Sequence, residues 1–345
     1  MWKMNSAPFW RCGFCEREPL LLWQNGKGQA EGRLLFPALN SPQLFDAYGL
    51  PFTEGIDYIY QSNRIIRTDH SRIPVLLQEE YMPPSPTAHS APFRQVGGEL
   101  LYTEGRFLIN KQIYANYSYN LRNFSQYHSL SISQLTNIKQ MLQQHRPIRT
   151  VLLGDSLGEG CNCTQVLHCY PYSPPWYIQF IMELSRRWKT QVEIPQGYNL
   201  SKGGMLSEYG AQIAAKAAGL AADLVIVEFG TNDGTFQISP QIYKSHIQFI
   251  LETILEKNPA CEFILCSPIL ANPDSIQSGS QTTYLPCLID LSNEYPCSVA
   301  DFISLHTALL STGKPYSDFS SNNINHPNDF FITAMAQILL ELFEE

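Results

Sequence analysis

From residue 129 onward, short apolar runs alternate with longer stretches of helical period. A first helical stretch passes through Gln134, Ile138 and Leu142, and it leads to an apolar run at Val151–Leu153. Further helices are predicted at Trp176–Trp188, Glu208–Leu220, Pro240–Glu256 and Asp329–Phe343, and further strands at Val192–Ile194, Leu224–Phe229 and Phe263–Cys266. Strands that alternate with helices predict an α/β domain with a parallel sheet flanked by helices.

The first part of the chain has a different pattern, with short strand-like pieces between turn residues and no long amphipathic helix. The pieces are Arg33–Phe36, Tyr58–Tyr60, Arg64–Arg67, Pro74–Gln78, Glu99–Tyr102 and Gln112–Tyr119. Regularly spaced short strands are typical of an all-β sandwich. We therefore predict a β-sandwich domain at residues 1–128, a helical connection at 129–147 and the α/β domain at 148–345.

Composition narrows the classes of function. The chain has 345 residues, of which 16% are charged, and its formal net charge is −8. This charge argues against nucleic-acid partners, which bind basic surfaces. The chain has no apolar run of about 18 residues, as a membrane span needs, and Pro8, Arg11 and Glu16 interrupt any signal-like start. We expect a cytoplasmic protein without a membrane span.

The nine cysteines are scattered and odd in number, so reduced thiols are expected. Cys12 and Cys15 have a zinc-like spacing, but no second pair stands at ligand distance from them, and structural zinc needs four ligands. We expect neither a metal nor a cofactor.

The apolar run at Val151–Leu153 stops at Gly154-Asp155-Ser156-Leu157. Ligands of α/β folds bind beyond the carboxyl ends of such strands, so Ser156 is placed at the mouth of the sheet. A serine in a turn is equally explained by local hydrogen bonding, and the neighbouring Asp155 is expected to fix this turn. The rest of the sequence has to decide between a structural and a nucleophilic serine.

Three later segments supply partners for a nucleophile: Asn199-Leu200-Ser201-Lys202-Gly203-Gly204, Gly230-Thr231-Asn232-Asp233 and Asn323-Ile324-Asn325-His326-Pro327-Asn328. Each has a structural explanation when taken alone, Gly204 as a turn glycine, Asn232 as a cap residue and His326 as a loop histidine. A serine hydrolase needs an activated hydroxyl, a base and donors for the oxyanion, and together the segments provide all three.

In this order the four segments resemble the sequence blocks of the SGNH hydrolases, also called the GDSL esterase/lipase family. The resemblance implies a flavodoxin-like three-layer α/β/α domain. It also implies Ser156 as nucleophile, His326 as base, and Ser156, Gly204 and Asn232 as donors to the oxyanion. No metal or cofactor takes part in the implied chemistry.

One position departs from the family pattern. The family usually places an aspartate three residues before the histidine to orient its ring, whereas position 323 is asparagine. An amide oxygen can accept from the imidazole but cannot compensate its positive charge. Three alternatives stay open for the orienting group: Asn323, a backbone carbonyl, or a nearby acid such as Asp318.

Weaker motifs, among them Gly55-Ile56-Asp57-Tyr58 and Ser71-Arg72-Ile73-Pro74, look like a bacterial branch of the family in which a jelly-roll-like β-sandwich precedes the hydrolase domain. That branch includes carbohydrate esterases, so the resemblance implies a small-molecule or oligosaccharide ester as substrate. A lipid or thioester acyl hydrolase is the alternative among enzymes, and a catalytically weak glycan-binding protein is the alternative of another class. The sequence does not determine the oligomeric state.

Overall fold

The computed structural model describes residues 4, 7–24, 28–92, 98–124, 127, 130 and 134–344. Its C-terminal part is built on five parallel strands in the order β12-β11-β13-β14-β15. Their bounds are β11 Ile148–Gly154, β12 Val192–Glu193, β13 Leu224–Glu228, β14 Glu262–Cys266 and β15 Cys297–Ala300. Numbered along the chain this order is 2-1-3-4-5, which is the flavodoxin-like order of a doubly wound sheet.

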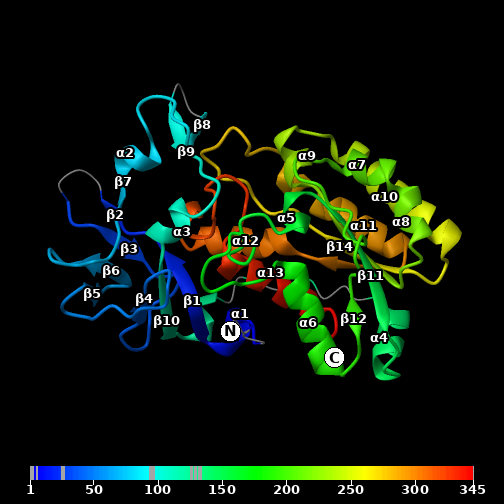
Figure 1. Ribbon diagram of the computed structural model, residues 1–345, viewed down its shortest axis with the longest axis horizontal. Coiled ribbons are helices and arrows are strands. Elements are labelled where there is room, and N and C mark those ends of the chain that lie inside the picture. The colour runs from blue at the N-terminus through cyan, green and yellow to red at the C-terminus, as the bar shows by residue number, and fades with distance from the viewer. Residues whose placement is uncertain are drawn as a thin grey trace.

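Helices cover both faces of this sheet (Figure 1). The side chains of β11 alternate between the faces, so that Val151 and Leu153 join one apolar cluster and Leu152 joins the other. The first cluster includes side chains of α7 Ser207–Gln212, α8 Ala214–Gly219, α10 Pro240–Lys257 and α11 Leu285–Glu294, and the second those of α4 Thr136–Gln143, α6 Trp176–Trp188, α12 Phe302–Ser311 and α13 Asp329–Glu341. The predicted three-layer α/β/α architecture is confirmed.

The N-terminal part is β-rich, as predicted, and consists of small sheets. One sheet has the order β1-β10-β4, a second has the order β5-β6-β3-β2-β7, and β8 pairs with β9. The bounds are β1 Phe14–Leu20, β2 Trp23–Gln24, β3 Glu31–Arg33, β4 Gln43–Phe45, β5 Tyr58–Gln61, β6 Arg64–Arg67, β7 Leu76–Leu77, β8 Ser90–Pro92, β9 Glu99–Leu101 and β10 Ile113–Ser118. This pairing does not establish a jelly-roll.

Short helices complete the chain. They are α1 Phe9–Cys12, α2 Gln78–Tyr81, α3 Phe107–Lys111, α5 Ser156–Glu159 and α9 Thr231–Thr235, together with the 3-10 turns η1 Leu121–Phe124, η2 Gln281–Thr283 and η3 Tyr316–Asp318. The helix predicted over Glu208–Leu220 is divided in two at Ile213. In the part of the chain that the structure describes, no helix is long and apolar enough to cross a membrane.

The two parts of the chain share one apolar core, because side chains of β1 and β10 belong to the same cluster as side chains of α6 and α13. A buried ionic group lies within this contact. The Lys314 ammonium is paired with the carboxylates of Glu18 on β1 and Asp318 on η3, and all three side chains are at most 1% exposed. The contact is therefore part of the folded core and not a loose docking surface.

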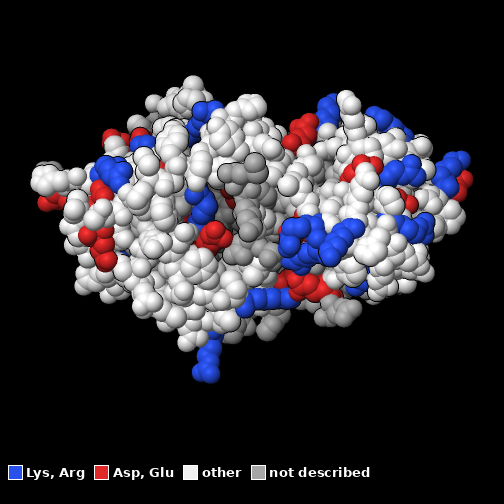
Figure 2. Space-filling view, turned by 60° about the horizontal axis from the view of Figure 1, so that its bottom comes forward, with Lys and Arg blue, Asp and Glu red and all other residues white. Residues whose placement is uncertain are grey.

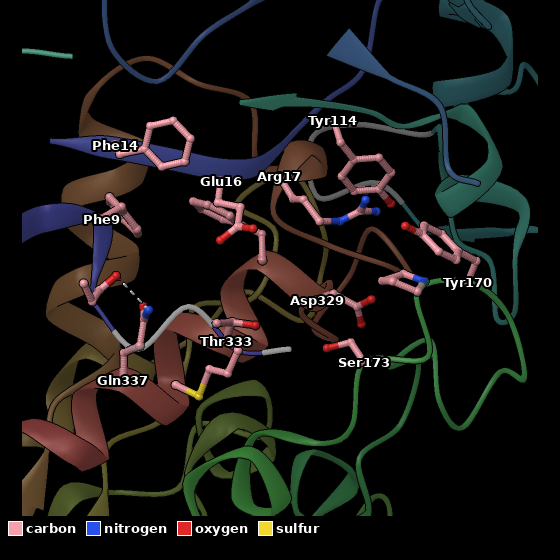
Figure 3. Close-up of a pocket in the computed structure, with 14 residues that line it drawn as sticks. Phe9, Phe14, Glu16, Arg17, Tyr114, Tyr170, Ser173, Asp329, Thr333 and Gln337 are labelled. Atoms are coloured by element: carbon pink, nitrogen blue, oxygen red, sulfur yellow. Dashed lines mark hydrogen bonds between the residues drawn. The ribbon is translucent and has the colours of Figure 1, made fainter. Parts of the chain in front are cut away.

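A cavity of about 280 Å³ lies along the same contact, between β1 and α13 (Figure 3). A register shift in β1 and a positive φ of 52° at Arg17 direct this side chain toward the rings of Tyr114 and Tyr170, whose centroids lie 4.4 and 5.4 Å from its guanidinium carbon. Bulges commonly re-aim a side chain in this way. Arg17 thus joins β1 to the loop that carries Tyr170.

The surface in Figure 2 is mostly uncharged, and several of its basic side chains lie next to acidic ones. Examples are the ion pairs of Arg186 and Arg187 with Glu183 on α6.

Candidate active site

The segment that carries Ser156 follows directly from the end of β11. Asp155 caps α5, and its Oδ1 accepts a hydrogen bond of 2.9 Å from the Leu157 backbone N–H. A carboxylate at this position satisfies a helix donor that has no partner within the helix, which explains why the strand turns sharply here. Ser156 is therefore the first residue of the helix, directly after the carboxyl end of β11.

His326 lies against the Ser156 hydroxyl. Its Nε2 is 2.9 Å from Ser156 Oγ, although the two residues are 170 positions apart in the sequence. The histidine loop is held by Asn322, whose Oδ1 accepts from the backbone N–H groups of residues 324, 325 and 326. The predicted nucleophile and base are thus brought into hydrogen-bond contact.

Asn162 occupies the place of the orienting residue. Its Oδ1 lies 2.6 Å from His326 Nδ1, and its side chain is buried. An amide oxygen only accepts, so Nδ1 must carry the proton and Nε2 is left to accept from the serine hydroxyl. This is the tautomer that a general base for Ser156 requires.

Asn162 was not predicted from the sequence. The orienting residue was expected shortly before His326, whereas Asn162 lies six residues after Ser156. Asn162 has a φ of 63°, and Gly160, two residues earlier, has a φ of 77°. Asparagine tolerates this left-handed conformation better than most residues. An asparagine in a turn directly after the α5 helix is the signal that was available, and it is a weak one.

The structure does not bring Asn323 to the imidazole. Its Nδ2 donates to the carbonyl of Leu101 at 2.9 Å, and its Oδ1 accepts from Asn272 at 3.2 Å. The Nδ2 end of the amide therefore holds the end of β9, and the Oδ1 end is bound to Asn272. The expectation that Asn323 orients His326 is wrong, because its φ of 67° and these bonds direct the side chain elsewhere.

Asp318 is not an orienting residue either. It is paired with Lys314 at 3.2 Å and accepts from the Leu21 backbone N–H at 3.0 Å, deep in the contact between the two parts of the chain. Burial raises its pKa to about 6, against the opposing effect of the Lys314 charge. The third alternative was a backbone carbonyl as the group that orients His326. The structure places the side chain of Asn162 at Nδ1 instead.

The three expected oxyanion donors lie at the same end of the sheet. Among the residues that the structure describes, the backbone N–H groups of Ser156 and Gly204 have no hydrogen-bond acceptor, and Gly204 faces the same pocket as Ser156 and His326. Gly204 has a φ of 76°, while the space around its Cβ position is open. Glycine is therefore required here by the backbone conformation and not by a close approach.

Asn232, the third expected donor, is tied to the turn that carries Ser156. Its Nδ2 donates to Asp155 Oδ2 at 3.1 Å and to the Met205 carbonyl at 3.0 Å. The neighbouring Asp233 accepts hydrogen bonds from Ser207 and fixes the loop. Asn232 thus reaches the pocket in a fixed position, and its bond to Met205 has to yield if Nδ2 is to bind an oxyanion.

Replacing Asn232 by alanine is expected to lower turnover by roughly 10²- to 10³-fold, as the loss of one oxyanion donor typically does. The steady-state rate on a p-nitrophenyl ester and the circular dichroism spectrum measure activity and fold separately. Near-normal turnover in a folded variant would remove Asn232 from the oxyanion site.

Buried acids lie behind the nucleophile. Burial raises the pKa of Asp155 to about 7, and it raises the pKa of Glu228 at the end of β13 well above its ordinary value, with the charge of Asp155 adding to the effect. Burial lowers the pKa of His326, and the nearby Glu104 carboxylate opposes this shift. The imidazole is therefore kept neutral, as a base must be, near neutral pH.

The pocket in front of Ser156 has a volume of about 750 Å³ and is formed by both parts of the chain. Tyr102 and Glu104 come from the segment after β9, and Phe236 and Ile276 come from the α/β domain. The volume is in the usual range for small-molecule sites. The sequence did not predict that residues of the N-terminal part, such as Tyr102 and Glu104, line the site.

Comparison with protein families identifies the chain. The model of the GDSL-like lipase/acylhydrolase family matches residues 152–330, which is just over half of the 345 residues. The chain belongs to this family. As a family member it is a carboxylic ester hydrolase, which agrees with the resemblance seen in the sequence. A search of curated protein sequences finds no match.

Solved structures with similar folds include esterases. A two-domain esterase (CEX) active on acetylated mannans has a TM-score of 0.47 and 15% identity over 60% of this chain and 52% of that chain. Axe2, an acetylxylan esterase from Geobacillus stearothermophilus, has a TM-score of 0.44 and 14% identity over 57% and 95% of the two chains. A lipolytic protein of the G-D-S-L family from Veillonella parvula has a TM-score of 0.44 and 17% identity over 56% and 97%. The present chain thus spans about half the length of the mannan esterase.

Proposed function

We propose that this family member uses Ser156 as nucleophile and His326 as base to remove acetyl or other short acyl groups from carbohydrate esters. The observation that carries the proposal is the 2.9 Å contact between Ser156 Oγ and His326 Nε2, beside two backbone N–H groups that have no acceptor in the described part of the chain. A nucleophile, a base and oxyanion donors are the three components that acyl transfer needs.

The reaction proceeds in two displacements. Ser156 Oγ attacks the ester carbonyl while His326 Nε2 takes the hydroxyl proton, and the N–H groups of Ser156 and Gly204, with Asn232 Nδ2, bind the oxyanion. His326 then gives the proton to the leaving alkoxide, and the acyl group remains on Ser156. Water, activated by the same histidine, attacks the acyl-enzyme and restores the serine.

The lining of the pocket supports a short acyl group and a polar alcohol. Asn325, Gln277 and Thr235 bring hydrogen-bonding groups to the wall, and Tyr102 and Phe236 bring aromatic faces. Phe236 is 66% exposed, so its ring is available for contact with a sugar. Aromatic rings with polar neighbours suit a sugar, whose faces are apolar and whose edges carry hydroxyl groups.

The test compares acetate release from acetylated oligosaccharides with hydrolysis of p-nitrophenyl esters of increasing acyl length. We expect kcat/KM to be highest for acetyl and to fall by at least about tenfold by octanoyl, since a long acyl chain would cover the polar groups of Asn325, Gln277 and Thr235 without offering them hydrogen bonds. An organophosphate inhibitor should add to Ser156, as detected by mass spectrometry of the peptide. A preference for long acyl chains would contradict the carbohydrate assignment and favour a lipid hydrolase.

A further inference from the structure

Glu104 is a carboxylate that the N-terminal part of the chain brings to the catalytic histidine. Its Oε1 lies 3.8 Å from His326 Nδ1, the same ring nitrogen that faces Asn162. Within the described part of the chain, no other carboxylate oxygen comes within 4.0 Å of a ring nitrogen of His326. Glu104 belongs to neither the hydrolase fold nor the matched family region at 152–330.

The carboxylate is held in this place by hydrogen bonds. The Tyr102 hydroxyl donates a hydrogen bond of 2.9 Å to Glu104 Oε1, and Asn322 Nδ2 donates one of 3.5 Å to the same oxygen. The side chain is 52% exposed, so solvent reduces the effect of its charge but does not remove it.

The backbone that carries Glu104 is tied to the histidine loop. Thr103 N–H donates to the Asn322 carbonyl at 3.3 Å, and Asn323 Nδ2 donates to the Leu101 carbonyl at 2.9 Å. The second bond needs an N–H donor, which an ionised aspartate at position 323 lacks. Asparagine at this position therefore fastens the segment with Glu104 to the site, where the family pattern has an acid that orients the ring directly.

A charge at this position has a function that Asn162 cannot perform. His326 becomes positively charged when it takes the serine proton, and a neutral amide orients the ring without compensating that charge. We propose that Glu104 stabilises the imidazolium form of His326 electrostatically, as a positioning residue supplied by the N-terminal part of the chain, while Asn162 orients the ring. The inference rests on the proposed Ser156–His326 chemistry.

Among the described residues, other titratable groups near the site do not supply a charge beside the His326 ring. Burial raises the pKa of Tyr102 to about 12 and that of Cys161 to about 11, so both stay neutral around neutral pH. The Asp155 carboxylate accepts hydrogen bonds from Leu157 and Asn232, and the Glu159 carboxylate accepts one from the Gly203 N–H. Asp155 and Glu228 have raised pKa values and titrate in the wild type and in a Glu104 variant alike, so a difference between the two pH profiles reports on Glu104.

The test is Glu104→Gln, which keeps the shape of the side chain and removes its charge. The carboxylate raises the pKa of His326, so its loss should move the acidic limb of the kcat/KM profile to lower pH. On p-nitrophenyl acetate, kcat at the plateau should fall by about tenfold, the equivalent of one pKa unit, with little change in KM. Glu79→Gln, the same charge change at an exposed position of α2, should leave the profile unchanged.

Asn162→Asp provides the second measurement, because it places a carboxylate directly at Nδ1. In the Asn162→Asp variant, the additional Glu104→Gln change should lower kcat by less than about twofold, since the effects of two groups that serve one function are not additive. An unchanged pH profile in Glu104→Gln, or an effect on KM alone, would overturn the role of Glu104. Persistence of full activity in Ser156→Ala would instead overturn the proposed function, so the two failures are distinguishable.

Discussion

Replacing Ser156 by alanine is expected to lower kcat on acetyl esters by roughly 10⁴- to 10⁶-fold, because no acyl-enzyme can form without the hydroxyl. The remaining rate would come from the oxyanion donors, which still polarise the carbonyl and bind the developing charge. Ser156 Oγ is bound to His326 Nε2 at the pocket surface and not to the core, so the melting temperature should change little. Pre-steady-state kinetics with substrate in excess should lose any burst of released alcohol that marks acyl-enzyme formation.

Ser201 provides a matched control from the same site. Its hydroxyl is buried behind the nucleophile turn and, among the described residues, has no hydrogen-bond partner. Ser201→Ala should therefore keep kcat within about threefold of the wild type, in the range of substitutions that touch no reacting group. If the two alanine variants lost activity equally, the loss would reflect damage to the turn and not removal of a nucleophile.

The part of the site that follows from local sequence was predictable. Val151–Leu153 is buried on both faces, and the chain has to turn at Gly154 and Asp155 to start α5, so Ser156 could be placed at the sheet mouth from the pattern alone. The segments that carry Gly204, Asn232 and His326 follow strands of this sheet or precede helices that pack on it. Parallel strands bring such ends to one edge, which is why His326 meets Ser156 across 170 positions.

The orienting residue was not predictable in the same way. Asn162 reaches His326 through two left-handed residues in a turn, and such a path leaves no periodic pattern in the sequence. Glu104 depends on how the two parts of the chain pack, and no pairwise spacing reveals that. Asn323 was misassigned because its position in the sequence was used as evidence for its orientation, whereas its amide is bound to Leu101 and Asn272.

Replacing Lys314 by methionine is expected to destabilise the fold by roughly 3–5 kcal/mol, because removing one partner of a buried ion pair leaves uncompensated charge. Glu18 and Asp318 would remain buried without their cation. Urea unfolding at constant protein concentration measures the change in free energy. Exposed Lys216 on α8 provides the control, since Lys216→Met should change the free energy of unfolding by no more than about 0.5 kcal/mol.

The pH dependence of this loss identifies its cause. Burial raises the pKa of Asp318 to about 6, so this carboxylate is neutralised at pH 5, and Lys314→Met should be less destabilising at pH 5 than at pH 8. Adding Glu18→Gln and Asp318→Asn should recover part of the lost stability, because neutral amides are less costly to bury than unpaired carboxylates. Glu18, Lys314 and Asp318 thus join β1 to η3. A loss below about 1 kcal/mol that did not depend on pH would mean that apolar packing, and not this ionic group, joins the two parts of the chain.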